Sequence, residues 1–194
     1  PLRLVGSEMC IRDRYPGEQG GTAVADVLFG DYNPAGRLPL TYYKSLDELP
    51  AFDDYDITKG RTYKYFKGDV LYPFGYGLSY SSFKYSDLKV KDGANTVSVS
   101  FRLKNTGKRK GDEVAQVYVR IPETGGVVPI KELKGFRRIP LKSGESRVVE
   151  IELDKEQLRY WDAGLGRFIV PQGAFDIMVG ASSKDIRLQT VINL

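Results

Sequence analysis

Residues 97–103 read Val-Ser-Val-Ser-Phe-Arg-Leu, and apolar and polar side chains alternate along them almost without fault. Because successive side chains of a strand point to opposite faces, this period of two predicts a β-strand with one buried face. The run ends at Asn105-Thr106-Gly107, a turn-forming triplet, and a second apolar run follows soon after it. The stretch therefore predicts neighbouring antiparallel strands.

The same pattern recurs along residues 82–194, where short apolar runs are separated by Gly-containing turns. It predicts strands at 83–90, 96–104, 113–121, 130–139, 146–153, 167–170, 174–181 and 186–193. A single helical turn is expected at 156–160. Many short strands without a long helix indicate an antiparallel β-sandwich of the immunoglobulin or fibronectin type.

The part before the sandwich differs in kind. Residues 22–29 carry apolar side chains on one helical face, with Thr22 as the expected N-cap and Gly30 as the left-handed residue that ends the helix. Residues 37–43 predict a short strand, irregular or at a sheet edge because it contains Pro39. One helix and one strand cannot make two layers, so residues 15–50 are expected to belong to a larger sheet.

Residues 51–81 are rich in aromatic side chains. Six of the 13 tyrosines lie between Tyr55 and Tyr80, and their spacing fits neither one helix nor one strand. We expect an ordered arm whose rings pack on another part of the protein, rather than a platform for stacking sugars.

Composition excludes several kinds of chemistry. The 194 residues include no histidine and one cysteine, Cys10. The chain alone can therefore build no Ser-His-Asp triad, no histidine-ligated metal site and no intrachain disulfide. Carboxylate, lysine or tyrosine chemistry remains, as does binding without chemistry. We expect no cofactor and no metal site.

Charge and hydropathy favour neither nucleic acid nor a membrane as partner. The net charge is +4, with 29 Lys and Arg against 25 Asp and Glu, and the densest basic run, at 108–110, is typical of a turn. No apolar stretch reaches the length of a membrane span, and no signal peptide is visible. Residues 1–14 lack periodicity and a cap, and 7–14 look like translated adapter sequence, so we expect a non-native leader.

Three places in the sequence hold candidate sites. The acidic residues Asp47, Glu48, Asp53, Asp54 and Asp56 match neither a glycosidase pair nor a calcium loop, which favours a solvated or cation-paired loop. The glycines of 17–21 precede a helix but lack the lysine of a phosphate-binding loop. The single tryptophan, Trp161, is expected on a turn, in core or edge packing.

Seven strings of this sequence resemble the rear part of glycoside hydrolase family 3. YPGEQGG (15–21) and VADVLFGDYNPAGRLPLT (24–41) are similar to the end of that family's second, α/β sandwich domain. GRTYKYF (60–66) and LYPFGYGLSYSSFKYSDL (71–88) resemble its linker. The fibronectin III-like domain is matched by three strings: VSVSFRLKNTGKRKGDEVAQVYV (97–119), KELKGFRRIPLKSGES (131–146) and FDIMVGASS (175–183).

The resemblance implies a mainly β chain in four parts: the leader (1–14), the remnant of an α/β sandwich domain (15–50), an aromatic linker (51–81) and a fibronectin III-like domain (82–194). It implies a retaining exo-β-glycosidase acting on terminal glucosyl or xylosyl residues, periplasmic or secreted, whose Asp nucleophile and Glu acid/base lie upstream. No residue of this chain is assigned a catalytic role, neither Glu8 nor Glu18. The fragment is expected to be inactive and to pack on its own N-terminal domains. The alternative is a stand-alone module that binds carbohydrate or protein.

Overall fold

The computed structural model of the chain describes residues 17–162 and 164–194, so the expectation for the leader at 1–14 falls outside the described residues. The chain divides into two compact units, one ending at Asn33 and the other spanning Pro34–Leu194. Within the described ranges, no helix has the length and apolar content needed to cross a bilayer.

The first unit contributes one helix, α1 (Gly20–Phe29). Gly30 ends it with a φ of 84°, and its N–H donates to the Val27 carbonyl, so the expected C-terminal glycine is confirmed. The expected N-cap at Thr22 is wrong. A backbone turn closed by the Gly20 N–H and the Gly17 carbonyl starts the helix three residues earlier, with Gln19 as N-cap and no side-chain cap.

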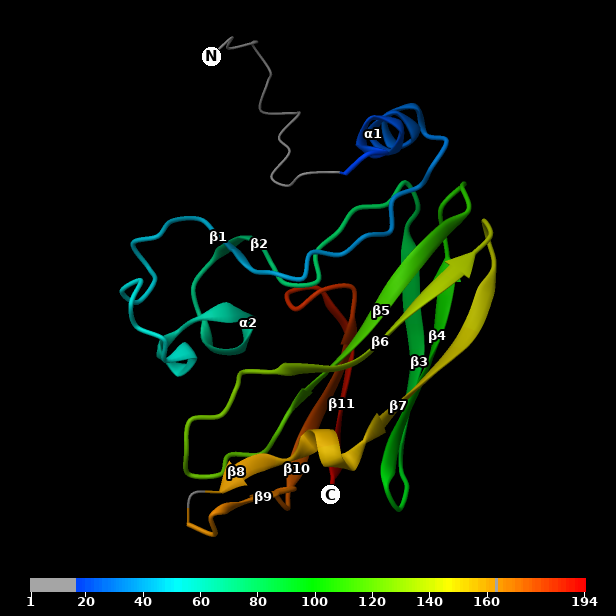
Figure 1. The fold of residues 1–194 in the computed structure, drawn as a ribbon. Helices are drawn as coiled ribbons and strands as arrows, with labels where there is room; N and C mark the ends of the chain where they lie inside the picture. The colour runs from blue at the N-terminus through cyan, green and yellow to red at the C-terminus, as the bar shows by residue number, and fades with distance from the viewer. Residues whose placement is uncertain (1–16, 163) are drawn as a thin grey trace. The chain divides into compact units, whose positions relative to one another are not determined.

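The second unit is built around an antiparallel β-sandwich, as predicted (Figure 1). One sheet has the order β3-β4-β7 and the other has the order β11-β10-β5-β6. The strand bounds are β3 (Phe83–Asp92), β4 (Thr96–Asn105), β5 (Gly111–Arg120), β6 (Glu132–Leu141), β7 (Ser146–Asp154), β10 (Ala174–Gly180) and β11 (Ile186–Asn193). Every pairing within these two sheets is antiparallel.

The core lies between the two sheets and follows the predicted alternation. Val97, Val99, Phe101 and Leu103 of β4 are at most 1% exposed, and they join one apolar cluster with residues from the opposite sheet. Each such buried side chain contributes about 1.5–3 kcal/mol relative to an exposed one. The period-two pattern at 97–103 therefore marks the centre of the sandwich.

Strand β5 departs from this alternation because it is buried on both faces. Ala115, Val117 and Val119 point into the core, while Gln116 and Tyr118 lie on the outer face and are still at most 2% exposed. An uncovered outer face would be solvated, so another layer must cover these two side chains. The segment that does so is the aromatic arm.

The arm, taken as residues 34–81 so that it includes the segment before the predicted linker, contains little regular structure. Its elements are β1 (Tyr42–Tyr43), a 3-10 turn (Ile57–Lys59), α2 (Thr62–Tyr65) and β2 (Val70–Tyr72), and β1 pairs with β2. The strand expected over 37–43 is therefore limited to its last two residues. Pro39 lacks an N–H and cannot continue a ladder, so Leu38 instead exchanges backbone hydrogen bonds with Gly75 and Tyr76.

Two further differences lie after β7. The helical turn expected at 156–160 is a 3-10 helix at Lys155–Leu158, whose first turn is capped by Asp154 and whose Leu158 is fully buried. The next residues form a small hairpin, β8 (Tyr160–Asp162) with β9 (Arg167–Ile169). Trp161 thus lies on a strand and not on a turn.

Candidate functional site

In the acidic loop at 47–56, Asp54 binds a cation and Asp56 caps a 3-10 turn, in agreement with the expected solvated or cation-paired loop. Asp54 forms an ion pair with Lys59 at 2.7 Å, and the hydrogen bond from Lys59 lowers the pKa of Asp54. Asp56 accepts from the hydroxyl and the N–H of Thr58, which lowers its pKa too. Carboxylates held ionised in this way serve the local turn and do not form an acid and base pair.

Glu113 is the most deeply buried carboxylate described. It lies on β5, and its side chain is 6% exposed. Its Oε1 accepts from Arg37 Nη2 at 2.6 Å and from the Val114 N–H at 2.8 Å. Because Arg37 is itself only 11% exposed, the pair joins the arm to the sandwich out of reach of solvent. Removing either partner would leave the other charge buried and uncompensated.

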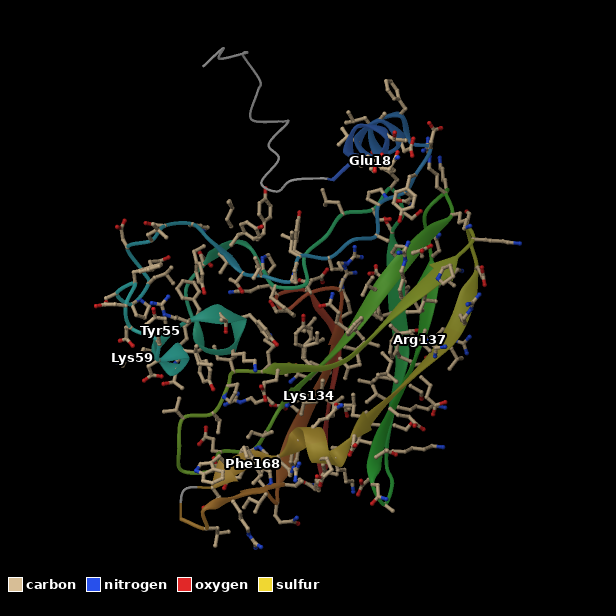
Figure 2. All side chains as sticks on the ribbon, in the orientation of Figure 1. Glu18, Tyr55, Lys59, Lys134, Arg137 and Phe168 are labelled. Atoms are coloured by element: carbon tan, nitrogen blue, oxygen red, sulfur yellow. The ribbon has the colours of Figure 1, made fainter. Side chains whose placement is uncertain are left out.

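Glu132 at the start of β6 makes a second link between arm and sandwich. Lys64 of α2 approaches Oε1 at 2.5 Å, and Lys134 approaches Oε2 at 2.9 Å. Burial alone would raise the pKa of Glu132, but the hydrogen bonds from Lys64 and Lys134 outweigh it and hold the pKa below the ordinary value. This carboxylate is therefore ionised, and each of its oxygens already binds a lysine. Figure 2 shows Lys134 on β6.

The described residues offer no cluster suited to a metal ion. Among residues 17–162 and 164–194, no three Asp, Glu or Cys side chains gather as potential ligands, and the sequence has no histidine. The glycines at 17–21 form the turn that enters α1.

The rings of the arm pack against one another and against the sandwich. Tyr63 stacks on Phe74 with centroids 4.2 Å apart and contacts the ring of Tyr118 edge to face. Its hydroxyl accepts from the Leu133 N–H at 3.0 Å, and burial raises the pKa of Tyr63. These contacts agree with the expectation of packing rather than of an open stacking platform.

Hydrogen bonds of Gln116 and Tyr118, together termed the polar lock, hold the arm at Gly75. Gln116 Nε2 donates to the Gly75 carbonyl at 3.1 Å and to the Ala181 carbonyl at 2.6 Å, while the Tyr118 hydroxyl donates to Gln116 Oε1 at 2.6 Å. Gly75 has a φ of +81°, and a Cβ there would lie 2.1 Å from Gln116 Oε1. Only glycine allows the arm to approach β5 this closely.

The β8–β9 hairpin displays an aromatic pair. Trp161 and Phe168 are cross-strand partners with centroids 5.2 Å apart, and they are 55% and 58% exposed. The expected edge packing of Trp161 is therefore a packing against Phe168, with both rings still open to solvent. In Figure 2, Phe168 lies on this hairpin, well apart from Tyr55 and Lys59 of the arm.

Comparison with known families accounts for both parts of the chain. Residues 9–80 match the Glycosyl hydrolase family 3 C-terminal domain, and residues 113–183 match the Fibronectin type III-like domain. The chain belongs to glycoside hydrolase family 3. Both domains occur in the order that the seven strings predict. The arm lies within the first match up to residue 80, and residues 81–112, which include β3 and β4, separate the two matches.

The family 3 relatives are much longer proteins. The chain is 45% identical to a xylan 1,4-beta-xylosidase of Xylanibacter ruminicola, over 91% of the chain and 21% of the relative. It is 37% identical to a periplasmic beta-glucosidase of Salmonella typhimurium, over 96% of the chain and 27% of the relative. Beta-glucosidase 3B from Thermotoga neapolitana, solved with glucose, superposes with a TM-score of 0.83 at 36% identity, covering 90% of the chain and 26% of that structure. The chain thus spans about a quarter of these proteins.

Sequence reasoning missed the buried polar links between arm and sandwich. One signal for them was present: Glu113 occupies an inward position of a strand that is otherwise apolar on that face, and such a charge requires a partner. Nothing in the pattern around Arg37, 76 residues away, identifies it as that partner.

Proposed function

We propose that the protein to which this chain belongs is a retaining exo-β-glycosidase that releases terminal β-D-glucosyl or xylosyl residues from oligosaccharides. The names of its family 3 relatives, a xylan 1,4-beta-xylosidase and several beta-glucosidases, support this assignment. Such an enzyme needs a nucleophilic carboxylate and a carboxylic acid about 5 Å apart, and it needs no cofactor. The family resemblance assigns both groups to upstream domains.

In that enzyme the present segment is structural. The observation that carries this proposal is the state of its buried carboxylates: Glu113 is held by Arg37, and Glu132 by two lysines. The two lysines hold the pKa of Glu132 below its ordinary value, so it cannot act as an acid near neutral pH, and Glu113 is already engaged by its buried partner Arg37. The segment would stabilise the enzyme and would not perform the chemistry.

Helix α1 supplies the surface for packing on the upstream domains. Three apolar side chains of this helix are open to solvent: Val24 is 48% exposed, Leu28 69% and Phe29 83%. Exposed apolar side chains in such a cluster favour a covering partner. The relative named as periplasmic supports a periplasmic or secreted location.

The assignment is tested by turnover of aryl β-glucosides and aryl β-xylosides. We expect the 194-residue chain to show none, and the longer protein translated from the same reading frame to hydrolyse at least one of them with retention at the anomeric carbon. Turnover by the purified 194-residue chain would contradict the structural role. A longer protein without glycosidase activity would contradict the enzyme assignment.

A second function, binding of glycan by the sandwich itself, is favoured by one observation, the exposed pair of Trp161 and Phe168. Flat rings match the apolar faces of pyranoses. Because Trp161 is the single tryptophan, its fluorescence reports on this hairpin alone. Quenching by xylo- or cello-oligosaccharides that disappears in Phe168→Ala but persists in Phe136→Ala, a variant of an exposed phenylalanine on β6, would support it.

A further inference from the structure

A cavity of about 240 Å³ lies where three segments of the second unit meet. The arm supplies Tyr63 and Phe66, the chain entering β6 supplies Ile130 and Lys131, and the loop between β10 and β11 supplies Lys184. Its size is below that of a typical pocket for a drug-sized ligand, which favours a ligand of about one sugar ring.

Three cations line this cavity without an acidic partner. Lys67, Lys131 and Lys184 all belong to its wall, and none of them forms an ion pair with any Asp or Glu that the structure describes. The Lys131 ammonium instead donates to the backbone carbonyl of Ser183 at 2.7 Å. Two of these lysines have an acidic neighbour in sequence, and both acids are already paired. Glu132, next to Lys131, binds two other lysines, and Asp185, next to Lys184, binds Arg187.

The electrostatics of Lys131 are unfavourable in the unliganded protein. Burial lowers the pKa of Lys131, and the positive charge of Lys184 lowers it further. Two like charges placed together beside an apolar wall repel each other, and a bound anion would relieve that repulsion. The arrangement costs stability in the free protein, which favours a ligand over chance placement.

The rest of the lining is mostly apolar. Phe66, Val70, Pro73 and Ile130 belong to it, together with Tyr63, whose ring is already stacked on Phe74. Side chains of this kind suit the C–H face of a pyranose and do not suit a bare inorganic ion. The cavity thus combines lysines with apolar surface.

From these features we propose that the cavity is a binding site for a carboxylated sugar ring, a hexuronate. The carboxylate lies toward Lys131 and Lys184, and the ring lies against Phe66 and Ile130. The inference depends on the charge and shape of this cavity and not on hydrolysis by the longer protein.

The test is calorimetric titration of the 194-residue chain with sodium glucuronate at constant ionic strength. We expect saturable binding that is weakened about tenfold or more in the double variant Lys131→Gln/Lys184→Gln, since charge-assisted hydrogen bonds to a carboxylate are stronger than neutral ones. The control Lys84→Gln/Lys91→Gln removes the same charge from β3 and should bind as the parent does.

Three matched ligands make the result decisive. Glucose has the ring without the carboxylate, acetate has the carboxylate without the ring, and inorganic phosphate is an anion without carbon. Glucuronate must bind more tightly than all three. Equal binding of glucose, of acetate or of phosphate would overturn the proposal, as would absence of glucuronate binding or an equal loss in both double variants. A circular dichroism melt of each variant shows that the fold is retained.

Discussion

Two buried tyrosines of the sandwich provide a matched test of the polar lock between arm and β5. Tyr118 is fully buried, and its hydroxyl donates to Gln116 Oε1 at 2.6 Å. Tyr85 is 7% exposed, and its hydroxyl has no hydrogen-bond partner among the described residues. The same substitution, Tyr→Phe, therefore removes a satisfied hydroxyl in one case and an unsatisfied one in the other.

The expected magnitudes follow from what each deletion leaves behind. Tyr118→Phe leaves Gln116 Oε1 buried without a donor, at a cost of about 1–3 kcal/mol in the free energy of unfolding. We expect about 2 kcal/mol, or roughly a 30-fold change in the unfolding equilibrium constant. Tyr85→Phe removes a buried polar group that makes no bond, so we expect no loss, or a gain of up to about 1 kcal/mol. Its ring keeps the stack on Phe101.

The assay is urea unfolding of the parent and the two variants, followed by far-ultraviolet circular dichroism at neutral pH. Equal slopes against urea would show that the surface exposed on unfolding is unchanged, so that midpoints report stability alone. An equal loss in both variants, or a larger loss for Tyr85→Phe, would refute the contrast between a bonded Tyr118 hydroxyl and an unbonded Tyr85 hydroxyl.

Three other outcomes are expected. Arg37→Met should lower the free energy of unfolding by about 3–5 kcal/mol, because it leaves Glu113 buried without its cation; a loss below about 1 kcal/mol, measured by urea unfolding, would exclude a buried pair. Tyr76→Ala removes the ring that packs 5.2 Å from Tyr72 and should speed limited proteolysis within 66–80; identical cleavage rates would count against it. Burial raises the pKa of both Tyr85 and Tyr118, so the unfolded chain loses these protons first and stability falls above about pH 10, by up to about 1.4 kcal/mol per pH unit for each tyrosine. The slope should be smaller in Tyr85→Phe, and an unchanged slope from about pH 10 to 11.5 would contradict this.

The sandwich could be predicted because its signal is local. Alternation along 97–103 reports directly which side chains of β4 face the core, and the structure buries Val97, Val99, Phe101 and Leu103. The turn at Asn105 is equally local: its side chain accepts from the Gly107 N–H, donates to the Arg109 carbonyl and closes the bend between β4 and β5. Neighbouring residues suffice to specify both features.

The arm could be predicted only in outline. Its tyrosines indicate burial, but the partner of each ring is set by tertiary contacts such as that of Tyr63 with Tyr118. Of the small hairpin, strand β9 was predicted at 167–170, whereas β8 (Tyr160–Asp162) was missed because its first residue falls in the predicted helical turn and the rest in a predicted turn. The cavity could not be predicted from the sequence, because Lys67, Lys131 and Lys184 come from segments that only the fold brings together.

The double burial of β5 has a practical consequence for where this protein can be cut. A polypeptide that begins at Ser82 would keep every strand of the sandwich, but it would lack the arm that covers Gln116 and Tyr118. The outer face of β5 would then be exposed and prone to association. A fusion of this domain to another protein should therefore begin at Pro34, where the second compact unit begins. The arm forms a third layer of the domain and has to be included.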